Sequence, residues 1–294
     1  MIVSEPLVTQ SAERRTARPP LVTIEPLRGW APLGLHELWK CRELIYFFVW
    51  RDVKIRYKQT ILGAAWAVLQ PLLTMVVFSV IFGHLAGLPS DGTPYPIFTY
   101  TALLPWQLFA YALSQTAISL VSHQQLLKKV YFPRLVIPVS AVLCWVVDFS
   151  IGFLVLLVMM VYYGIVPTLA IFTVPLFVVF AMVAALAVGL WLATLNVQFR
   201  DVRYAIPFLI QFWLFITPVA YSSSLILDRM PERWRFLYGL NPMTGVVEGF
   251  RWALLGKSGD VGSLIFISAL VVVGLLLSGV IYFRRMEGTF SDVV

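Results

Sequence analysis

The chain has 294 residues, of which 60% are apolar and only 13% are charged, and its mean hydropathy is +0.84. Soluble domains usually carry about 25% charged residues, so this composition excludes an ordinary soluble domain and predicts a membrane protein. The formal net charge of +7 is no evidence for nucleic-acid binding, because Lys and Arg in membrane proteins report topology.

The N-terminal end is predicted to be a flexible cytoplasmic tail over 1–34, followed by an amphipathic interface helix over 35–59. Apolar side chains recur in that helix at intervals of three and four. Lys40, Arg51 and Lys54 lie mostly off this stripe, and a basic face opposite Trp and Phe is typical of a helix in the membrane interface. A helix packed on a soluble domain is the alternative interpretation.

Six long apolar segments without Lys or Arg follow, and their continuity predicts helices rather than the alternating strands of a barrel. The predicted spans are 61–84, 97–120, 136–163, 171–195, 206–221 and 261–283. Most of the 22 Lys and Arg residues precede the first span, follow the second or fourth, or lie at the C-terminal end. The positive-inside rule then predicts cytoplasmic termini, an all-α six-span domain over 60–285 and a cytoplasmic tail over 286–294.

The segment 222–260 holds the remaining Lys and Arg and is predicted to lie on the outer side. Its aromatic residues suggest two short helices, broken at Asn241–Pro242, that dip into the outer leaflet. A folded external loop with aromatic interface anchors is the alternative. Gly245 and Gly249 form a GxxxG pair, which indicates close helix contact.

No motif for ATP, metal or nucleophilic chemistry is recognisable in the sequence, and we expect neither enzyme activity nor a cofactor on this chain. The run 256–258 lacks the glycine that a phosphate-binding loop needs five residues earlier. Cys41 and Cys144 are expected to be free thiols. Asp148 lies in a span, where it either marks an ion pathway or, as we favour, bonds to a neighbouring helix or faces a wet cavity. Transport would then need energy from another polypeptide.

Uncharged polar and aromatic residues share helix faces in the first two spans, and the fifth span carries an aromatic stripe. Such groups suit a hydroxyl-rich glycan, since rings pack on sugar C–H groups and amides bond to sugar hydroxyls. Alternatively, the polar groups bond helices together, and the aromatic stripe faces lipid or gates by dewetting. The pore-lining candidates are Trp66, Gln70, Thr74, Tyr100, Gln107, Tyr111, Phe208, Phe212 and Phe215.

Four sequence motifs resemble a known family. The run 51–73, RDVKIRYKQTILGAAWAVLQPLL, resembles the start of the membrane subunits of polysaccharide-export ABC transporters, which belong to the type-2 exporter superfamily. The same family is suggested by 128–138 (KKVYFPRLVIP), 199–204 (FRDVRY) and 240–256 (LNPMTGVVEGFRWALLG). The resemblance covers about residues 35–285.

The resemblance implies a homodimeric permease of the bacterial inner membrane that works with two ATP-binding cassette subunits, which hold the ATP and Mg. It implies a lipid-linked glycan such as O-antigen as substrate, exported from cytoplasm to periplasm. It further implies re-entrant helices that gate the outer side, and a coupling loop at about 121–135 whose short helix docks on the ATPase. The coupling candidates are His123, Lys128, Lys129, Arg134, Arg200 and Asp201.

The basic end of the interface helix lies where an anionic diphosphate headgroup would meet the membrane. Its residues either recruit the lipid end of the substrate or, as we favour, hold the helix on anionic lipid. They are Arg51, Lys54, Arg56 and Lys58. Alternative functions are a drug or lipid exporter permease of the same superfamily and, less favoured, a membrane-embedded glycosyl or acyl transferase. A transferase would need clustered acid–base groups, whereas Asp148 and Asp201 are predicted to lie far apart.

Overall fold

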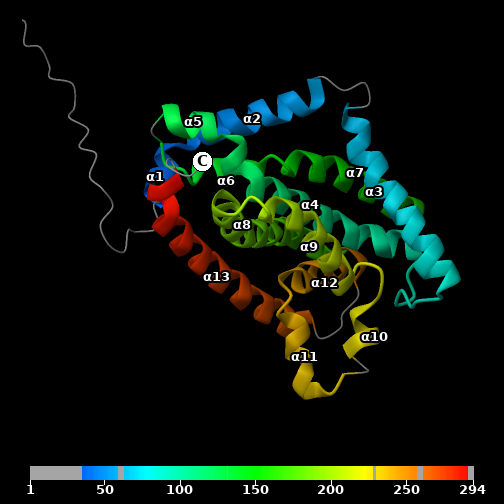
Figure 1. Ribbon diagram of the computed structural model, residues 1–294. Coiled ribbons are helices and arrows are strands. Elements are labelled where there is room, and N and C mark those ends of the chain that lie inside the picture. Colours follow the sequence, from blue (N-terminus) through cyan, green and yellow to red (C-terminus); the bar gives the residue numbers. More distant parts are fainter. Residues whose placement is uncertain (1–34, 59–62, 131, 228–229, 257–260, 291–294) are drawn as a thin grey trace, which may run out of the picture. The chain divides into compact units, whose positions relative to one another are not determined.

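The computed structural model describes residues 35–58, 63–130, 132–227, 230–256 and 261–290 (Figure 1). Helices and connecting turns make up these ranges, and no strand occurs within them. The predicted all-helical fold is therefore confirmed for the described ranges. The predicted tail over 1–34 and the last four positions of the predicted C-terminal tail lie outside the described residues.

The elements are named in chain order. They are α1 (Leu35–Lys40), α2 (Arg42–Lys58), α3 (Gly63–Phe78), the π-helix η1 (Ser79–Leu85), α4 (Tyr95–Ser122), α5 (Gln124–Lys129), α6 (Val136–Leu143), α7 (Val146–Tyr162), the 3₁₀ helix η2 (Leu169–Thr173), α8 (Val174–Gln198), α9 (Val202–Ile216), α10 (Ser223–Leu227), α11 (Glu232–Gly239), α12 (Pro242–Leu255), α13 (Val261–Met286) and the 3₁₀ helix η3 (Glu287–Thr289).

Four helical stretches among the described residues are long and apolar enough to cross a membrane. They are Ala65–Leu85, Val136–Tyr162, Leu169–Gln198 and Gly262–Met286, and they match the predicted first, third, fourth and sixth spans. The predicted second span lies in α4, which has 28 residues but carries Gln, Ser and Thr side chains that lower its hydropathy. The predicted fifth span, 206–221, overlaps α9 but runs past its end at Ile216. The 15 residues of α9 extend only about 22 Å, less than a hydrocarbon core of about 30 Å. The count of six spans stays a prediction.

Helix α4 lies at the centre of the packed helices, since most of its side chains between Ile97 and Leu120 are buried. Its most extensive contacts are with α8. A Cβ atom added at Gly189 of α8 would lie 2.5 Å from the Cγ2 atom of Thr116, so only glycine permits this approach. The close α4–α8 contact fixes the orientation of α4 and therefore of the polar residues on its other faces.

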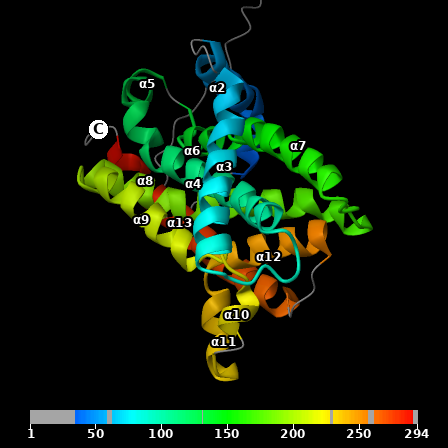
Figure 2. The same cartoon turned by 90° about the vertical axis from the view of Figure 1, so that its right-hand side faces the viewer.

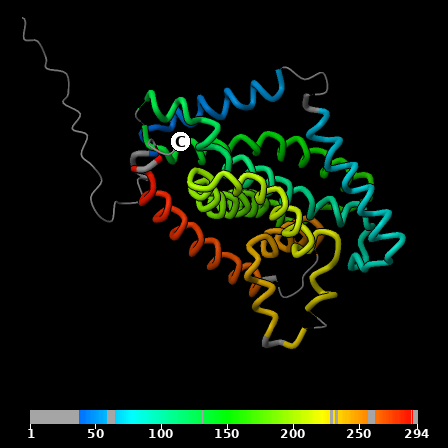
Figure 3. Tube along the Cα trace, viewed as in Figure 1, coloured from blue at the N-terminus to red at the C-terminus, as the bar shows by residue number. Residues whose placement is uncertain are grey.

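The helices that the sequence assigns to opposite membrane sides lie at opposite ends of the described helices. Helices α2 and α5 and the C-terminal end of α13 lie at one end, and α10 and α11 lie at the other, in both views (Figures 1 and 2). The Cα trace in Figure 3 shows α3 leaving the first end and α13 returning to it. This arrangement is the one expected when the chain enters and leaves the membrane on the same side.

The predicted interface helix consists of α1 and α2, which meet at Cys41. Phe48 of α2 is buried, and its ring centroid lies 6.2 Å from those of both Phe132 and His123. The opposite face exposes the aromatic side chains of Tyr46 and Trp50. Helix α2 therefore has two apolar faces, one packed on its own chain and one open. The sequence pattern, interpreted as one apolar stripe, did not identify Phe48 as the residue that faces the protein.

Candidate transport site

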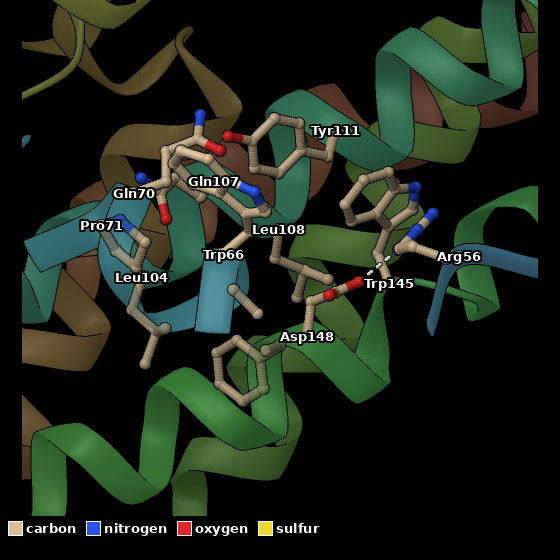
Figure 4. A pocket seen from close by; sticks show the side chains of 12 residues that line it. Arg56, Trp66, Gln70, Pro71, Leu104, Gln107, Leu108, Tyr111, Trp145 and Asp148 are labelled. Atoms are coloured by element: carbon tan, nitrogen blue, oxygen red, sulfur yellow. Dashed lines mark hydrogen bonds and ion pairs between the residues drawn. The ribbon is translucent and has the colours of Figure 1, made fainter. Parts of the chain in front are cut away.

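A pocket between α3, α4 and α7 brings together four of the predicted pore-lining residues. We call it the α3–α4–α7 pocket, and it contains about 690 Å³ of empty space, including its open mouth. Rings, amides and one ion pair form its main walls, drawn in Figure 4. These wall residues are Arg56, Trp66, Gln70, Gln107, Tyr111, Trp145 and Asp148.

Helical spacing explains why these side chains meet. Trp66 and Gln70 are four residues apart on α3, and Gln107 and Tyr111 are four apart on α4, so each pair shares one helix face. The Tyr111 ring stacks on the ring of Trp145, with 4.7 Å between centroids and 18° between planes. Two helix faces that the sequence singled out separately thus line one pocket.

The remaining pore-lining candidates lie elsewhere. Tyr100 is fully buried and donates a hydrogen bond to the carbonyl of Gly152 at 3.2 Å, so it joins α4 to α7 as the helix-bonding alternative predicts. The hydroxyl of Thr74 donates to the carbonyl of Gln70 in its own helix, at 2.9 Å. The aromatic stripe lies on an open face of α9, where each side chain is more than half exposed. Its residues are Phe208, Phe212 and Phe215.

Asp148 bonds to α2, which confirms the favoured interpretation of this carboxylate. The Nη1 atom of Arg56 forms an ion pair with Asp148 Oδ2, and the hydroxyl of Tyr57 donates to Asp148 Oδ1 at 2.5 Å. The Arg56 guanidinium lies 3.6 Å from the centroid of the Trp145 ring. Burial and the hydrogen bond to Asp148 raise the pKa of Tyr57, so its hydroxyl keeps its proton and remains the donor.

The other basic residues of α2 divide into two kinds. Arg51 contacts Asp52 Oδ1 through Nε at 2.8 Å and His123 Nε2 through Nη2 at 2.7 Å. Because His123 Nδ1 lies 2.9 Å from the carbonyl oxygen of Ser119, which can only accept, Nδ1 carries the proton and Nε2 accepts from Arg51. Lys54 and Lys58 are exposed. Arg51 and Arg56 therefore cross-link α2 to its own chain, and the two lysines face outward.

Helix α5 confirms that the predicted coupling loop, at about 121–135, contains a short helix. Lys128 and Lys129 are exposed at its end, and Arg200 and Asp201 are exposed at the turn between α8 and α9. These four coupling candidates are therefore accessible to a partner protein.

Arg134, a fifth coupling candidate, is bonded to the C-terminal end of the chain. Its guanidinium donates to the carbonyl of Glu287, and its backbone N–H donates to Glu287 Oε1 at 3.3 Å. Arg284 pairs with the same carboxylate at 2.9 Å. Phe290 is fully buried, and the Arg134 guanidinium lies over its ring, with 5.8 Å between the guanidinium carbon and the ring centroid. Arg134 thus holds the coupling loop against η3, a role that its position in a loop did not reveal.

Helices α11 and α12 confirm the predicted helix pair broken at Asn241–Pro242. The Asn241 side chain caps α12 by accepting from Met243 N at 3.0 Å. It also accepts from Trp213 Nε1 at 2.9 Å and donates to Thr217 Oγ1 at 3.0 Å. Asn241 therefore bonds α12 to α9. The sequence signal was available, because Asn before Pro is a strong helix-start pair.

Arg251 of α12 is almost fully buried and holds the turn that follows α9. It donates to the carbonyls of Val219 and Tyr221 at 3.1 and 3.3 Å, and it pairs with Glu248 at 3.1 Å. Its guanidinium stacks 3.7 Å above the Phe98 ring. Sequence reasoning used Arg251 only to assign topology, although a charge within an apolar helix is itself a signal of internal bonding.

The GxxxG pair of α12 makes close contacts on two sides, as predicted. A Cβ atom added at Gly245 would lie 2.9 Å from the Cβ atom of Ser268 in α13. One added at Gly249 would lie 2.2 Å from Phe177 Cε1 in α8. Ser268 also donates to the carbonyls of Gly239 and Asn241, at 2.9 and 3.1 Å. Close packing and hydrogen bonds therefore both join α12 to its neighbours.

No group of three potential metal-ligating side chains gathers within the described ranges, and both cysteines are free thiols. The wall of the α3–α4–α7 pocket combines rings and amides with one neutralised charge pair. Such a surface can bind a ligand by ring packing and hydrogen bonds.

Comparison with known proteins identifies the family. The profile of the ABC-2 type transporter family matches residues 43–255. The chain is 30% identical over 254 residues to the O-antigen export system permease protein RfbA of Myxococcus xanthus, which covers 86% of this chain and 96% of the relative. It is 29% identical over 255 residues to the protein of the same name from Klebsiella pneumoniae, covering 86% and 95%.

A more distant relative is the polysialic acid transport protein KpsM of Escherichia coli, 22% identical over 250 residues that cover 82% of this chain and 93% of the relative. The family profile covers well over half of the chain and includes the α3–α4–α7 pocket, the coupling loop and α12. The chain is therefore a multi-pass membrane protein that belongs to the ABC-2 type transporter family.

Proposed function

We propose that this chain is the membrane subunit of an ATP-driven exporter that moves a lipid-linked polysaccharide of the O-antigen kind from the cytoplasm to the periplasm. The observation that carries the proposal is the similarity to O-antigen export permeases over 86% of the chain. The rings and amides of the α3–α4–α7 pocket support it, because they suit a hydroxyl-rich substrate better than a purely apolar drug.

In the proposed membrane arrangement, α4 and α9 complete a set of six spans in the bacterial inner membrane. The length of α4 supports its role, and its burial explains why it tolerates polar side chains. Helices α2 and α5 lie at the same end of the described helices as the C-terminal end of α13, which supports a cytoplasmic position for both termini. The open face of α9 supports a homodimer, in which a second copy would cover apolar surface.

The energy is proposed to come from two ATP-binding cassette subunits that hold the ATP and Mg, since this sequence carries no phosphate-binding loop. The exposed charges of Lys128, Lys129, Arg200 and Asp201 form the proposed docking surface. Helix α2 is proposed to rest on the inner leaflet through Tyr46 and Trp50, with Lys54 and Lys58 near lipid phosphates. Arg51 and Arg56, which are bonded within the chain, hold α2 in place.

Deletion and affinity purification test the function together. A strain that lacks the chain should lose its surface polysaccharide and accumulate glycan in the cytoplasm, and the purified chain should bring down an ATP-binding cassette protein. Unchanged surface glycan in the deletion strain would contradict the substrate, and increased drug sensitivity in its place would favour a drug exporter.

The docking surface has its own test. Lys128→Glu combined with Lys129→Glu should uncouple ATP hydrolysis from export, because reversed charges repel a surface that the lysines attract. Arg235→Glu is the control, since Arg235 is exposed on α11, at the opposite end of the described helices from α5. Normal export and normal glycan-stimulated hydrolysis in the double variant would show that the docking assignment is wrong.

A further inference from the structure

We propose that the α3–α4–α7 pocket is a binding subsite for a short stretch of neutral sugar residues, built within a single protomer. The inference rests on the proposed function, because it takes the exported glycan as the ligand. Its basis is the pocket's wall, in which ring faces, free amides and a neutralised charge pair surround one cavity (Figure 4).

The apolar part of the wall fits the C–H faces of a sugar ring. Trp66 is 53% exposed and lies on the pocket side of α3, so its indole face is available to a ligand. The stacked rings of Tyr111 and Trp145 form a second aromatic wall that is already held in place. Aromatic walls with a few placed polar groups are the usual composition of a small-ligand site.

The polar part of the wall offers unused hydrogen-bonding capacity. The side-chain amides of Gln70 and Gln107 line the pocket, and neither bonds to a residue in the described part of the chain. Each amide can donate two hydrogen bonds and accept two, which matches adjacent sugar hydroxyls. The buried indole N–H of Trp145 also lacks a partner within the described ranges. A membrane protein leaves such groups unpaired only at a cost unless water or a ligand meets them.

The charge distribution favours neutral sugars over acidic ones. Arg56 and Asp148 are the charged residues in the wall, and they pair with each other. An anionic sugar would have to compete with Asp148 for Arg56 and would approach a carboxylate of the same sign. A neutral sugar meets no such repulsion, and its hydroxyls can donate to the Asp148 carboxylate beside Tyr57.

The lining of the pocket weighs against a lipid acyl chain as its ligand. An acyl chain would fit the apolar side chains of Leu104 and Leu108, but it would leave two amides and a carboxylate facing hydrocarbon. The sugar is therefore the ligand that the wall favours.

Substitutions at Trp66 separate ring packing from simple bulk. We expect Trp66→Phe, which keeps a ring face, to restore export in the deletion strain, and Trp66→Leu, which keeps bulk alone, to lower it. The loss of one ring contact corresponds to roughly a three- to tenfold drop in surface glycan at equal protein level. Gln107→Ala should lower export similarly. Trp252→Leu, on α12 and outside the pocket, is the matched control.

A binding measurement accompanies the export assay. The complex with its ATPase, reconstituted in lipid nanodiscs, is titrated with the polysaccharide that mild acid releases from the cell surface of the producing bacterium. We expect saturable binding that weakens three- to tenfold in Trp66→Leu and stays unchanged in Trp66→Phe. Equal binding and export by Trp66→Leu and Trp66→Phe would overturn the subsite and would fit an acyl chain in its place.

The outcomes distinguish the two levels of inference. If the deletion strain keeps its surface glycan, the proposed function fails and the subsite fails with it. If the deletion removes the glycan but Trp66→Leu and Gln107→Ala restore it fully, the subsite is overturned and the proposed function stands. Unaltered ATPase co-purification in each variant excludes misassembly as the cause of any loss.

Discussion

Arg56 and Asp148 form an ion pair that joins α2 to α7, although 92 positions separate them in the chain. Their side chains are 30% and 18% exposed, so the pair lies between a surface and a buried salt bridge. Surface pairs contribute about 0–1 kcal/mol, whereas removal of one partner of a buried pair costs about 3–5 kcal/mol. The intermediate position suggests a cost of about 1–3 kcal/mol when one partner is removed.

Asp148→Ala should therefore lower the melting temperature of the purified protein, because Arg56 loses this ion pair and Tyr57 loses this hydrogen bond. Asp148→Asn should cost less, since an amide oxygen still accepts from Tyr57. The exchanged pair Arg56→Asp with Asp148→Arg should recover part of the stability that each single change removes. A double variant whose loss equals the sum of the single losses would show that the two residues do not interact energetically.

Asn241→Ala should destabilise the protein by about 2–3 kcal/mol, because it removes a helix cap and leaves the Trp213 indole N–H unpaired. Asn241→Asp keeps both accepted hydrogen bonds and loses only the one donated to Thr217. Thermal unfolding should accordingly rank the wild type above Asn241→Asp and Asn241→Asp above Asn241→Ala. Equal losses in both variants would contradict the capping role.

Gly249→Ala should destabilise the packing of α12 on α8, because the added methyl group would overlap the Phe177 ring. Overpacking of this kind usually costs about 1–3 kcal/mol. Gly274→Ala on α13 is the control, since nothing lies within 4 Å of its added Cβ atom. The second change Phe177→Leu should restore stability to Gly249→Ala. If it does not, the overlap with the Phe177 ring is not the cause of the destabilisation. Melting of each variant measures the effect.

Arg251→Lys should loosen the turn after α9, because a lysine ammonium cannot reproduce the planar stacking on Phe98 together with both carbonyl contacts. The expected result is a lower melting temperature and faster proteolysis in the outer segment. Arg235→Lys, at an exposed position on α11, should leave both unchanged. If Arg251→Lys behaves like Arg235→Lys, the turn is held by other contacts.

Local sequence patterns predicted the helical elements and the break at Asn241–Pro242, because helix propensity and capping depend on neighbouring residues. They gave a less complete account of α4. Hydropathy measures suitability for lipid, whereas α4 is largely covered by other helices and so tolerates Gln107 and Thr116. The same reasoning applies to α2, where Phe48 contacts the protein and Trp50 lies on the open face.

Part of the candidate site was also within reach of the sequence. The four-residue spacings on α3 and α4 grouped Trp66 with Gln70 and Gln107 with Tyr111. No spacing rule could bring Arg56 or Trp145 to the same cavity, because their approach depends on how α2 and α7 pack in three dimensions. For the same reason the sequence, which suggested Arg134 as a coupling residue, did not reveal its bonds to Glu287, 153 positions later in the chain.

The contact between Arg134 and the end of the chain also bears on how the protein can be handled in the laboratory. Phe290 packs edge to face on Phe283, with 5.2 Å between ring centroids, and the Arg134 guanidinium covers it. A purification tag fused just behind Phe290, or a truncation that removes it, would therefore disturb the loop that carries Lys128 and Lys129. A defect in ATPase assembly seen with such a fusion would then be caused by the tag and would not be a property of the untagged transporter.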